Sequence, residues 1–126
     1  MTEPRRRATY LQQSDLRLLD GWCRELWRYF STGPGPLGVY LGGSALTRPD
    51  YRDVDIRIML TDDTFAALAV IVHPEVLAIG LSLWGQRATG LPIDCQVQAM
   101  TAANAKHDGT RHAIGLRIDP RDADGT

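Results

Sequence analysis

The chain has 126 residues, of which 44% are hydrophobic and 23% are charged, and its formal net charge at pH 7 is -1. These proportions are those of an ordinary globular protein, and we expect a single domain over residues 1–126 with loose ends at 1–9 and 120–126. The near-zero charge excludes a global basic field that would draw the chain onto nucleic acid or anionic lipid. The longest apolar runs are too short or too interrupted to span a bilayer, so we expect no membrane contact.

The two cysteines, Cys23 and Cys95, are far apart in the sequence and form no cluster with metal-ligand spacing. No signal peptide is recognisable at the start of the chain. We therefore expect a cytoplasmic protein in which both thiols are reduced and buried. His73, His107 and His112 also lack metal-type spacing with Cys or Glu, so we expect no zinc site.

The first predicted element is a helix that begins after Ser14, the expected N-cap, and has Asp15 in its first turn. Apolar residues then recur at helical spacing and form one broad stripe. The residues of this stripe are Leu16, Leu19, Trp22, Cys23, Leu26, Trp27 and Phe30. The segment "STGPGP", residues 31–36, ends the helix.

Three segments are predicted to be short strands, namely residues 37–41, 54–60 and 93–99. Between the first two strands, the segment "SALT" at residues 44–47 predicts one turn of helix, and a loop follows it.

Two helices are predicted between the second and third strands. Asp62 and Asp63 resemble the cap of a helix over residues 64–72. Pro74 suits the first turn of a second helix, which continues over residues 75–88 and is expected to be largely buried.

After the third strand, residues 101–107 predict a short helix, whereas residues 111–119 are compatible with either a strand or a helix. The main order is therefore helix, strand, turn, strand, helix, strand. This order predicts an α/β or α+β domain built on a small mixed β-sheet with helices packed on one face.

The second and third strands each have one apolar side and one polar side, because side chains alternate along a strand. Asp53, Asp55 and Arg57 share the polar side of the second strand, and Asp94 lies on the polar side of the third. If both strands belong to one sheet, the aspartates converge on its open face. Such carboxylates repel one another unless a cation neutralises them, and Mg²⁺ does so more strongly than Arg57 can. The competing interpretation is a solvated sheet face with an Asp–Arg ladder.

Gly42, Gly43 and Ser44 follow the first strand. Backbone N–H groups at a tight turn into a helix form an anion site, and only glycine lets a phosphate approach so closely. The Ser44 hydroxyl can add a further hydrogen bond. A plain turn between two strands is the ordinary interpretation of such a tripeptide, but the aspartates that follow at residues 53 and 55 favour phosphate binding.

This combination resembles the minimal nucleotidyltransferases of the polymerase-β-like superfamily. The motif of that family is a hydrophobic residue, Gly, Gly or Ser, a spacer, and then Asp-hydrophobic-Asp/Glu-hydrophobic. Here Leu41, Gly42 and Gly43 precede a nine-residue spacer and the segment "DVDI" at residues 53–56. Counted from Gly43 and Ser44, the spacer has eight residues, which leaves open which pair forms the phosphate loop.

The third carboxylate of the family lies on a later strand, and Asp94 in "LPIDCQVQ" matches it. The resemblance covers roughly residues 37–99 and implies a nucleotidyltransferase-like fold that uses Mg²⁺ and an NTP such as ATP. It implies that Asp53 and Asp55 hold Mg²⁺ on the triphosphate. Asp94 would share a second metal ion and help to deprotonate an acceptor hydroxyl.

The resemblance also implies which residues contact the nucleotide. The β- and γ-phosphates would be gripped by Gly42, Gly43 and Ser44. Arg57 is a further candidate for nucleotide binding, because it lies on the carboxylate face. Other arginines near the motif are expected to be ordinary solvated side chains. These arginines are Arg48, Arg52 and Arg87.

Larger members of the superfamily carry additional helices or a second domain, whereas this chain stops soon after the third carboxylate. The resemblance therefore implies either a homodimer or a helical partner protein, as in two-gene toxin–antitoxin pairs. Trp84 and Tyr51 are aromatic candidates for such contacts, although core packing is favoured for Trp84.

The expected function is Mg²⁺-dependent transfer of a nucleoside monophosphate from an NTP to an RNA, a protein or a small-molecule acceptor. The alternative is a non-catalytic protein of the same fold that binds a nucleotide or a partner. A nucleic-acid-binding accessory protein is the weakest possibility, because the charge is near zero and basic and aromatic residues do not alternate.

Overall fold

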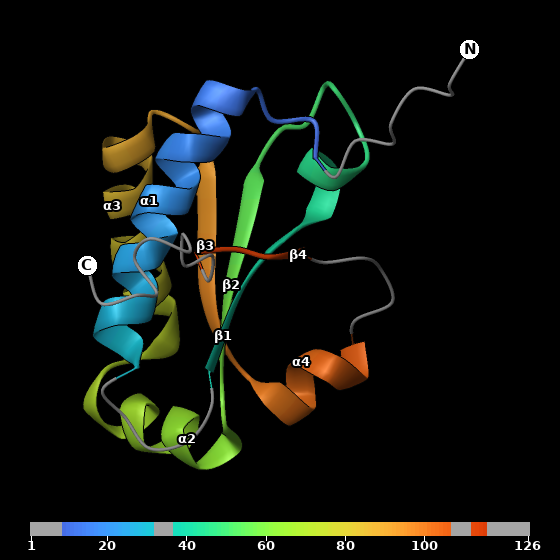
Figure 1. Cartoon of the computed structure of the whole chain (residues 1–126). Helices are drawn as coiled ribbons and strands as arrows, with labels where there is room; N and C mark the ends of the chain where they lie inside the picture. Colours follow the sequence, from blue (N-terminus) through green and yellow to red (C-terminus); the bar gives the residue numbers. More distant parts are fainter. Residues whose placement is uncertain (1–8, 32–36, 107–111, 116–126) are drawn as a thin grey trace, which may run out of the picture.

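Four strands form one mixed sheet in the order β3-β2-β1-β4 (Figure 1). The computed structural model describes residues 9–31, 37–106 and 112–115. The strands are β1 (Leu37–Gly42), β2 (Val54–Leu60), β3 (Ile93–Ala99) and the short β4 (His112–Ala113). The predicted strands are confirmed, and so is the predicted fold class, a small mixed α/β sheet domain.

The sheet is mixed because its strands are connected in two ways. β1 runs antiparallel to both β2 and β4, whereas β2 and β3 are parallel. A parallel pair requires a crossover connection, and the helices α2 (Asp62–Ile71) and α3 (Pro74–Thr89) supply it. β3 is the strand at one edge of the sheet. The side chains of Ser82 and Gln86 in α3 form hydrogen bonds with the backbone at this edge.

One face of the sheet is apolar and buried under helices. The β2 side chains of Val54, Ile56 and Ile58 are fully buried, and the helices α1 (Gln13–Phe30) and α3 lie over this face (Figure 1). Burial of each such side chain contributes about 1.5–3 kcal/mol. The residues that α1 buries against the sheet are Leu19, Trp22, Cys23 and Leu26.

Two predicted helix caps are wrong by one or two residues. α1 begins at Gln13 with Gln12 in the N-cap position, so Ser14 lies inside the first turn and is not the cap. α2 is capped by Thr61, whose hydroxyl accepts a hydrogen bond from the Thr64 N–H at 3.3 Å. A threonine hydroxyl is a sufficient cap, and Asp62 is therefore available for another contact.

That contact joins α2 to the helix α4 (Met100–Lys106). Asp62 Oδ1 accepts a hydrogen bond from the Thr101 N–H at 3.1 Å, which satisfies a donor in the first turn of α4. Hydrogen bonding from the Thr101 side chain, together with this N–H bond, holds the pKa of Asp62 below its usual range. The predicted short helix over 101–107 thus corresponds to α4, and residue 107 lies outside the described residues.

α3 begins and ends as its sequence predicts. Pro74 is in the first turn, the His73 ring accepts a hydrogen bond from the Glu75 N–H, and Gly90 ends the helix with a φ of 72°. The expectation that this helix is largely buried is wrong. Of its residues only Leu81, Gly85 and Thr89 are buried, because the sheet and α1 cover one side of the helix and no other described element covers the opposite side.

The aromatic side chains that were considered as contact residues have different environments. Trp84 is 39% exposed and packs edge-on against Trp22, with ring centroids 5.7 Å apart. The core placement favoured for Trp84 is therefore wrong, because the side chain is exposed although its ring contacts the buried Trp22. Tyr51 is partly buried and packs against the hydrophobic core.

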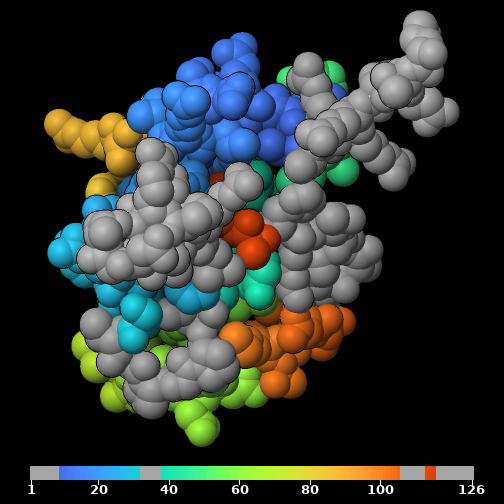
Figure 2. Space-filling view, viewed as in Figure 1, coloured from blue at the N-terminus to red at the C-terminus, as the bar shows by residue number. Residues whose placement is uncertain are grey.

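Of the segment 111–119, residues 112–113 form β4, while residue 111 and residues 116–119 lie outside the described residues. In Figure 2, β4 lies at the surface between α1 and α4. The expected loose ends also lie outside the described residues, apart from Thr9, whose hydroxyl donates a hydrogen bond to the main-chain oxygen of Ala45 at 2.9 Å.

Replacing Gly85 with alanine is expected to destabilise the fold by about 1–3 kcal/mol, because the new methyl group overpacks the contact between α1 and α3. A Cβ atom at Gly85 would lie 2.7 Å from the Trp22 ring and 2.9 Å from Ile93. Gly21→Ala is the matched control in α1, where nothing lies within 4 Å of the Cβ position. It should stabilise the helix by up to about 1 kcal/mol. Denaturant unfolding measures both changes, and equal stability of the two variants would contradict this packing.

Candidate nucleotide and metal site

The turn after β1 depends on a glycine in the left-handed conformation. Gly43 opens the 3₁₀ turn η1 (Gly43–Leu46) with a φ of 71°, which side chains other than glycine rarely adopt. A Cβ atom at Gly43 would overlap the carboxylate of Asp55. Gly42 differs, because its φ of -137° is extended and nothing lies within 4 Å of its Cβ position. The left-handed φ thus favours glycine at residue 43, and a side chain there would also displace the Asp55 carboxylate.

Strand register brings this turn beside two carboxylates. Gly42 pairs with Asp55 across β1 and β2, and Asp55 pairs with Asp94 across β2 and β3. Because neighbouring strands lie about 4.8 Å apart, Asp55 and Asp94 are immediate neighbours on the polar face. Asp53 precedes β2 in an exposed position. The structure therefore groups Gly43, Asp55 and Asp94, and Asp53 lies at the rim of this group.

Arg57 lies close to both carboxylates. Its Nη2 atom is 3.4 Å from Asp94 Oδ2 and 3.7 Å from Asp55 Oδ1. Its Nη1 atom donates hydrogen bonds to the main-chain oxygens of Asp94 and Ile56, at 2.8 and 3.0 Å. The side chains of Arg57 and Asp55 are 22% and 24% exposed, so salt screens their attraction only partly. Backbone hydrogen bonds and charge together hold the guanidinium in place.

The negative charge at Asp55 is not fully compensated. Burial raises the pKa of Asp55, Arg57 lowers it, and repulsion by Asp94 and Asp53 raises it again, so that the pKa lies above its usual value. The fold thus penalises the ionised form of this carboxylate. A bound cation would relieve the penalty, because it favours the charged form.

The chemistry of the donor set fits Mg²⁺ in part. Among the described residues, no group of three or more His, Cys, Asp or Glu side chains is arranged to hold a metal ion. Mg²⁺, however, is usually bound through one or two carboxylates, with water and substrate phosphates as its other ligands. The adjacent oxygens of Asp55 and Asp94 meet that requirement, and Asp53 is available at the rim.

A depression of about 390 Å³ opens on the polar face next to these residues. Its volume lies at the lower end of the range of small-molecule sites, which is about 300–1,000 Å³. It is lined by Tyr40, Gly42, Gly43, Asp55, Arg57, Met59, Phe65, Val97, Gln98, Ala99, Ala102 and Ala103. The turn, one carboxylate and the arginine thus share one concave surface with an apolar wall.

Sequence reasoning missed part of that wall. Tyr40 and Met59 follow from strand alternation, because they share the polar side of β1 and β2 with Gly42 and Arg57. Ala102 and Ala103 carry no signal in the sequence, since only the fold brings α4 to this face.

The other arginines near the motif are exposed, as expected, and do not line the depression on the polar face. Arg48 forms an exposed ion pair with Asp50 at 2.9 Å, and Arg52 and Arg87 are exposed. Ser44 lies in η1, where its main-chain oxygen accepts hydrogen bonds from the N–H groups of Thr47 and Arg48.

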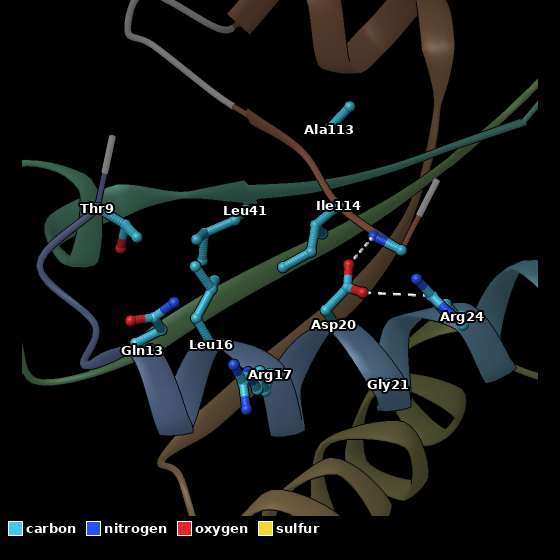
Figure 3. Close-up of a pocket in the computed structure, with 11 residues that line it drawn as sticks. Thr9, Gln13, Leu16, Arg17, Asp20, Gly21, Arg24, Leu41, Ala113 and Ile114 are labelled. Atoms are coloured by element: carbon cyan, nitrogen blue, oxygen red, sulfur yellow. Dashed lines mark hydrogen bonds and ion pairs between the residues drawn. The ribbon is translucent and has the colours of Figure 1, made fainter. Parts of the chain in front are cut away.

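A larger depression, of about 650 Å³, lies between α1 and β4 (Figure 3). Its lining includes Leu41, so it is on the α1 side of the sheet, and none of the strand-face aspartates borders it. The carboxylate of Asp20 there is already engaged, because Oδ1 accepts a hydrogen bond from the Gly115 N–H at 3.0 Å and Oδ2 lies 3.2 Å from Arg24 Nε. These bonds connect α1 to the segment after β4.

The predicted state of the cysteines is confirmed. Cys23 and Cys95 are both buried and free. Burial raises the pKa of the Cys95 thiol to about 12 and raises that of Cys23 further. Neither thiol is a nucleophile at neutral pH, because the thiolate is the reactive form.

Comparison of the chain with protein-family models, with curated proteins and with solved structures gives no match. The geometry of the turn, the carboxylates and the arginine is therefore the basis on which a function can be inferred.

Replacing Arg57 with glutamine is expected to lower the melting temperature in the absence of divalent ions, because Asp55 and Asp94 lose their shared cation. Mg²⁺ should restore part of the loss, since it neutralises the same carboxylates. Arg52→Gln, at an exposed position, is the control. It should change neither the melting temperature without divalent ions nor the increase in melting temperature that Mg²⁺ causes. Thermal unfolding with EDTA and with Mg²⁺ gives the measurement. If Mg²⁺ raises the melting temperature of Arg57→Gln no more than that of the wild type, the two carboxylates do not share a metal site.

Proposed function

We propose that the protein is a Mg²⁺-dependent nucleotidyltransferase, which moves a nucleoside monophosphate from an NTP to an acceptor hydroxyl. One observation carries the proposal: the glycine turn packs directly against a carboxylate that pairs in register with a second carboxylate. Gly43 has no room for a Cβ atom beside Asp55, and Asp55 pairs with Asp94. A phosphate on the turn would therefore lie next to a metal held by these carboxylates.

Each residue has a role in this proposal. The N–H groups of Gly43 and Ser44 bind phosphate oxygens, with Gly42 and Gly43 allowing close approach. Asp55 and Asp94, with Asp53 at the rim, hold Mg²⁺, which would neutralise the charge that develops on the phosphates. The acceptor oxygen forms a bond to the α-phosphorus as the bond to pyrophosphate breaks, and pyrophosphate leaves.

The proton of the acceptor hydroxyl passes to a nearby base, for which Asp94 is the candidate because its side chain is 41% exposed. The acceptor class is an RNA, a protein or a small molecule. A homodimer or a helical partner, as in a toxin–antitoxin pair, would supply further acceptor contacts.

A second candidate function is non-catalytic binding of a nucleotide or a partner. The ion pairs of Arg57 favour it, because a guanidinium near both carboxylates already compensates part of their charge. In that case the polar face is an Asp–Arg ladder that serves as a binding surface.

A label-transfer experiment separates the two candidates. The purified protein is incubated with each α-labelled NTP, Mg²⁺ and a cell lysate, beside the variant Asp53→Ala/Asp55→Ala. We expect label to move onto one class of acceptor with the wild type only. Binding of Mg²⁺-NTP without any transfer in any lysate fraction would favour the second candidate. Equal transfer by the variant would contradict the proposed site.

A further inference from the structure

The outer side of α3 is apolar although no described element covers it. Val76, Ile79 and Leu83 follow one another at helical spacing and are 60%, 62% and 59% exposed. The opposite side of the same helix buries Leu81 and Gly85 against the sheet and α1. A helix that is hydrophobic all round is normally buried on all sides, which indicates that something else covers the outer side.

The apolar surface extends beyond these three residues. We define the α3 patch as Val70, Ile71, Val76, Ile79, Leu83 and Trp84, which are between 39% and 87% exposed. Exposed apolar surface concentrated on neighbouring elements often marks an interaction site. No single helix among the described residues is apolar and long enough to cross a membrane, and α2 and α3 meet those criteria only as a pair bent by 90°.

Gly80 leaves room for a second helix to approach α3 closely. It lies on the outer side of α3, within one turn of Val76, Ile79 and Leu83. Glycine within a helix is unfavourable, and no contact within the described part of the chain requires it here, because nothing there lies within 4 Å of its Cβ position and its φ is not positive. A glycine at this place lets a second helix approach the backbone closely.

The edge of β3 is closed to an incoming strand. Ser82 Oγ accepts a hydrogen bond from the Cys95 N–H at 2.8 Å and lies 3.3 Å from the Cys95 oxygen. Gln86 Nε2 donates a hydrogen bond to the Ile93 oxygen at 3.0 Å. These side chains occupy backbone groups that a neighbouring strand would need, so a partner is directed to the helix surface.

We propose that the α3 patch is the interface with a second copy of this chain, with the two α3 helices packed antiparallel about a twofold axis near Leu81. In this arrangement Ile79 of one copy faces Leu83 of the other, and Gly80 lies at the crossing. Glu75 at the start of one helix comes near Arg87 at the end of the other. The sequence of α3 is therefore complementary to itself in both shape and charge.

A specific interface buries at least about 1,000 Å² in total, so the proposed dimer has to cover most of the α3 patch of each copy together with a polar rim. Ile79 and Leu83 of the patch border the same depression as Asp94, so a second copy on the α3 patch would lie beside that carboxylate. The proposal rests on the exposed helix surface and does not depend on the proposed function.

Sedimentation velocity of the full chain over a concentration series tests the proposal. We expect a dimer for the wild type, and Ile79→Glu should raise the dissociation constant at least about tenfold, because it buries an unpaired charge. Leu18→Glu, at an exposed leucine of α1, is the matched control and should dimerise normally. Circular dichroism and thermal unfolding establish that each variant is folded.

Charge exchange distinguishes a second copy from any other occupant. Glu75→Arg or Arg87→Glu alone should weaken the dimer several-fold, because each places like charges opposite one another, and the double variant should restore it by reversing both ion pairs. A wild type that stays monomeric at all concentrations would overturn the proposal, as would dimerisation unaffected by Ile79→Glu. Monomers that sediment with phosphatidylcholine vesicles through this patch would overturn it too, in favour of a lipid surface.

Discussion

Asp55→Asn is expected to abolish the effect of Mg²⁺ on the protein while leaving the metal-free fold at least as stable as the wild type. The fold raises the pKa of Asp55 through burial and through repulsion by Asp94 and Asp53, against the attraction of Arg57. A carboxyl whose pKa is raised on folding contributes stability only at low pH, and that contribution is lost as the pH rises through the folded pKa. Asparagine is neutral at every pH, so the variant retains this stability contribution at pH 7.

The same substitution should reduce nucleotide transfer about 1,000-fold or more, since metal-ion stabilisation of the transition state contributes several kcal/mol. Thermal unfolding with EDTA and with Mg²⁺ gives the stability, and α-labelled NTP gives the transfer rate. Asp50→Asn is the matched control, because Asp50 forms an exposed ion pair with Arg48. A variant that loses stability without metal and keeps its response to Mg²⁺ would contradict the role assigned to Asp55.

Gly43→Ala is expected to be far more damaging than Gly42→Ala, although the two glycines are adjacent. At Gly43 the left-handed φ costs roughly 1–2 kcal/mol for a residue with a side chain, and the new Cβ atom overlaps the Asp55 carboxylate. At Gly42 the backbone is extended and the Cβ position is open. Gly43→Ala should therefore lower the melting temperature and remove nucleotide binding.

The Gly42→Ala variant distinguishes an effect on the stability of the fold from an effect on the binding of phosphate near residue 42. Its fold should be nearly unchanged, so any loss of NTP affinity reports a phosphate that passes close to residue 42. Unfolding curves and nucleotide titrations of both variants are the measurements. Equal stability of Gly43→Ala and Gly42→Ala would show that the turn does not pack against Asp55 as described.

The faces of the sheet could be predicted from sequence because strand periodicity is local. Val54 and Ile56 alternate with Asp55 and Arg57, and this pattern alone determines which side chains share a face. The two faces of β3 are predicted in the same way, because Ile93 and Cys95 alternate with Asp94 and Gln96. The grouping of Asp55 with Asp94 required the register between two strands that are distant in the chain, and the sequence does not contain that register explicitly.

Other features could not be predicted because they depend on tertiary contacts. The Thr61 cap could not be distinguished from an aspartate cap, since both residue types are good caps. α3 was expected to be buried because apolar helices usually are, and its exposed side reflects a surface that the described chain does not cover. The position of Arg57 between two carboxylates depends on the backbone oxygens of Ile56 and Asp94.

The glycine turn and the carboxylates are proposed to form one site for Mg²⁺ and a nucleoside triphosphate. Isothermal titration calorimetry tests it most directly, because binding needs no acceptor. Each NTP is titrated into the wild type and into Asp53→Ala/Asp55→Ala, with Mg²⁺ and with EDTA. We expect binding of at least one NTP by the wild type only, and only with Mg²⁺. Absence of binding by the wild type, or equal binding by the folded variant, would contradict the claim.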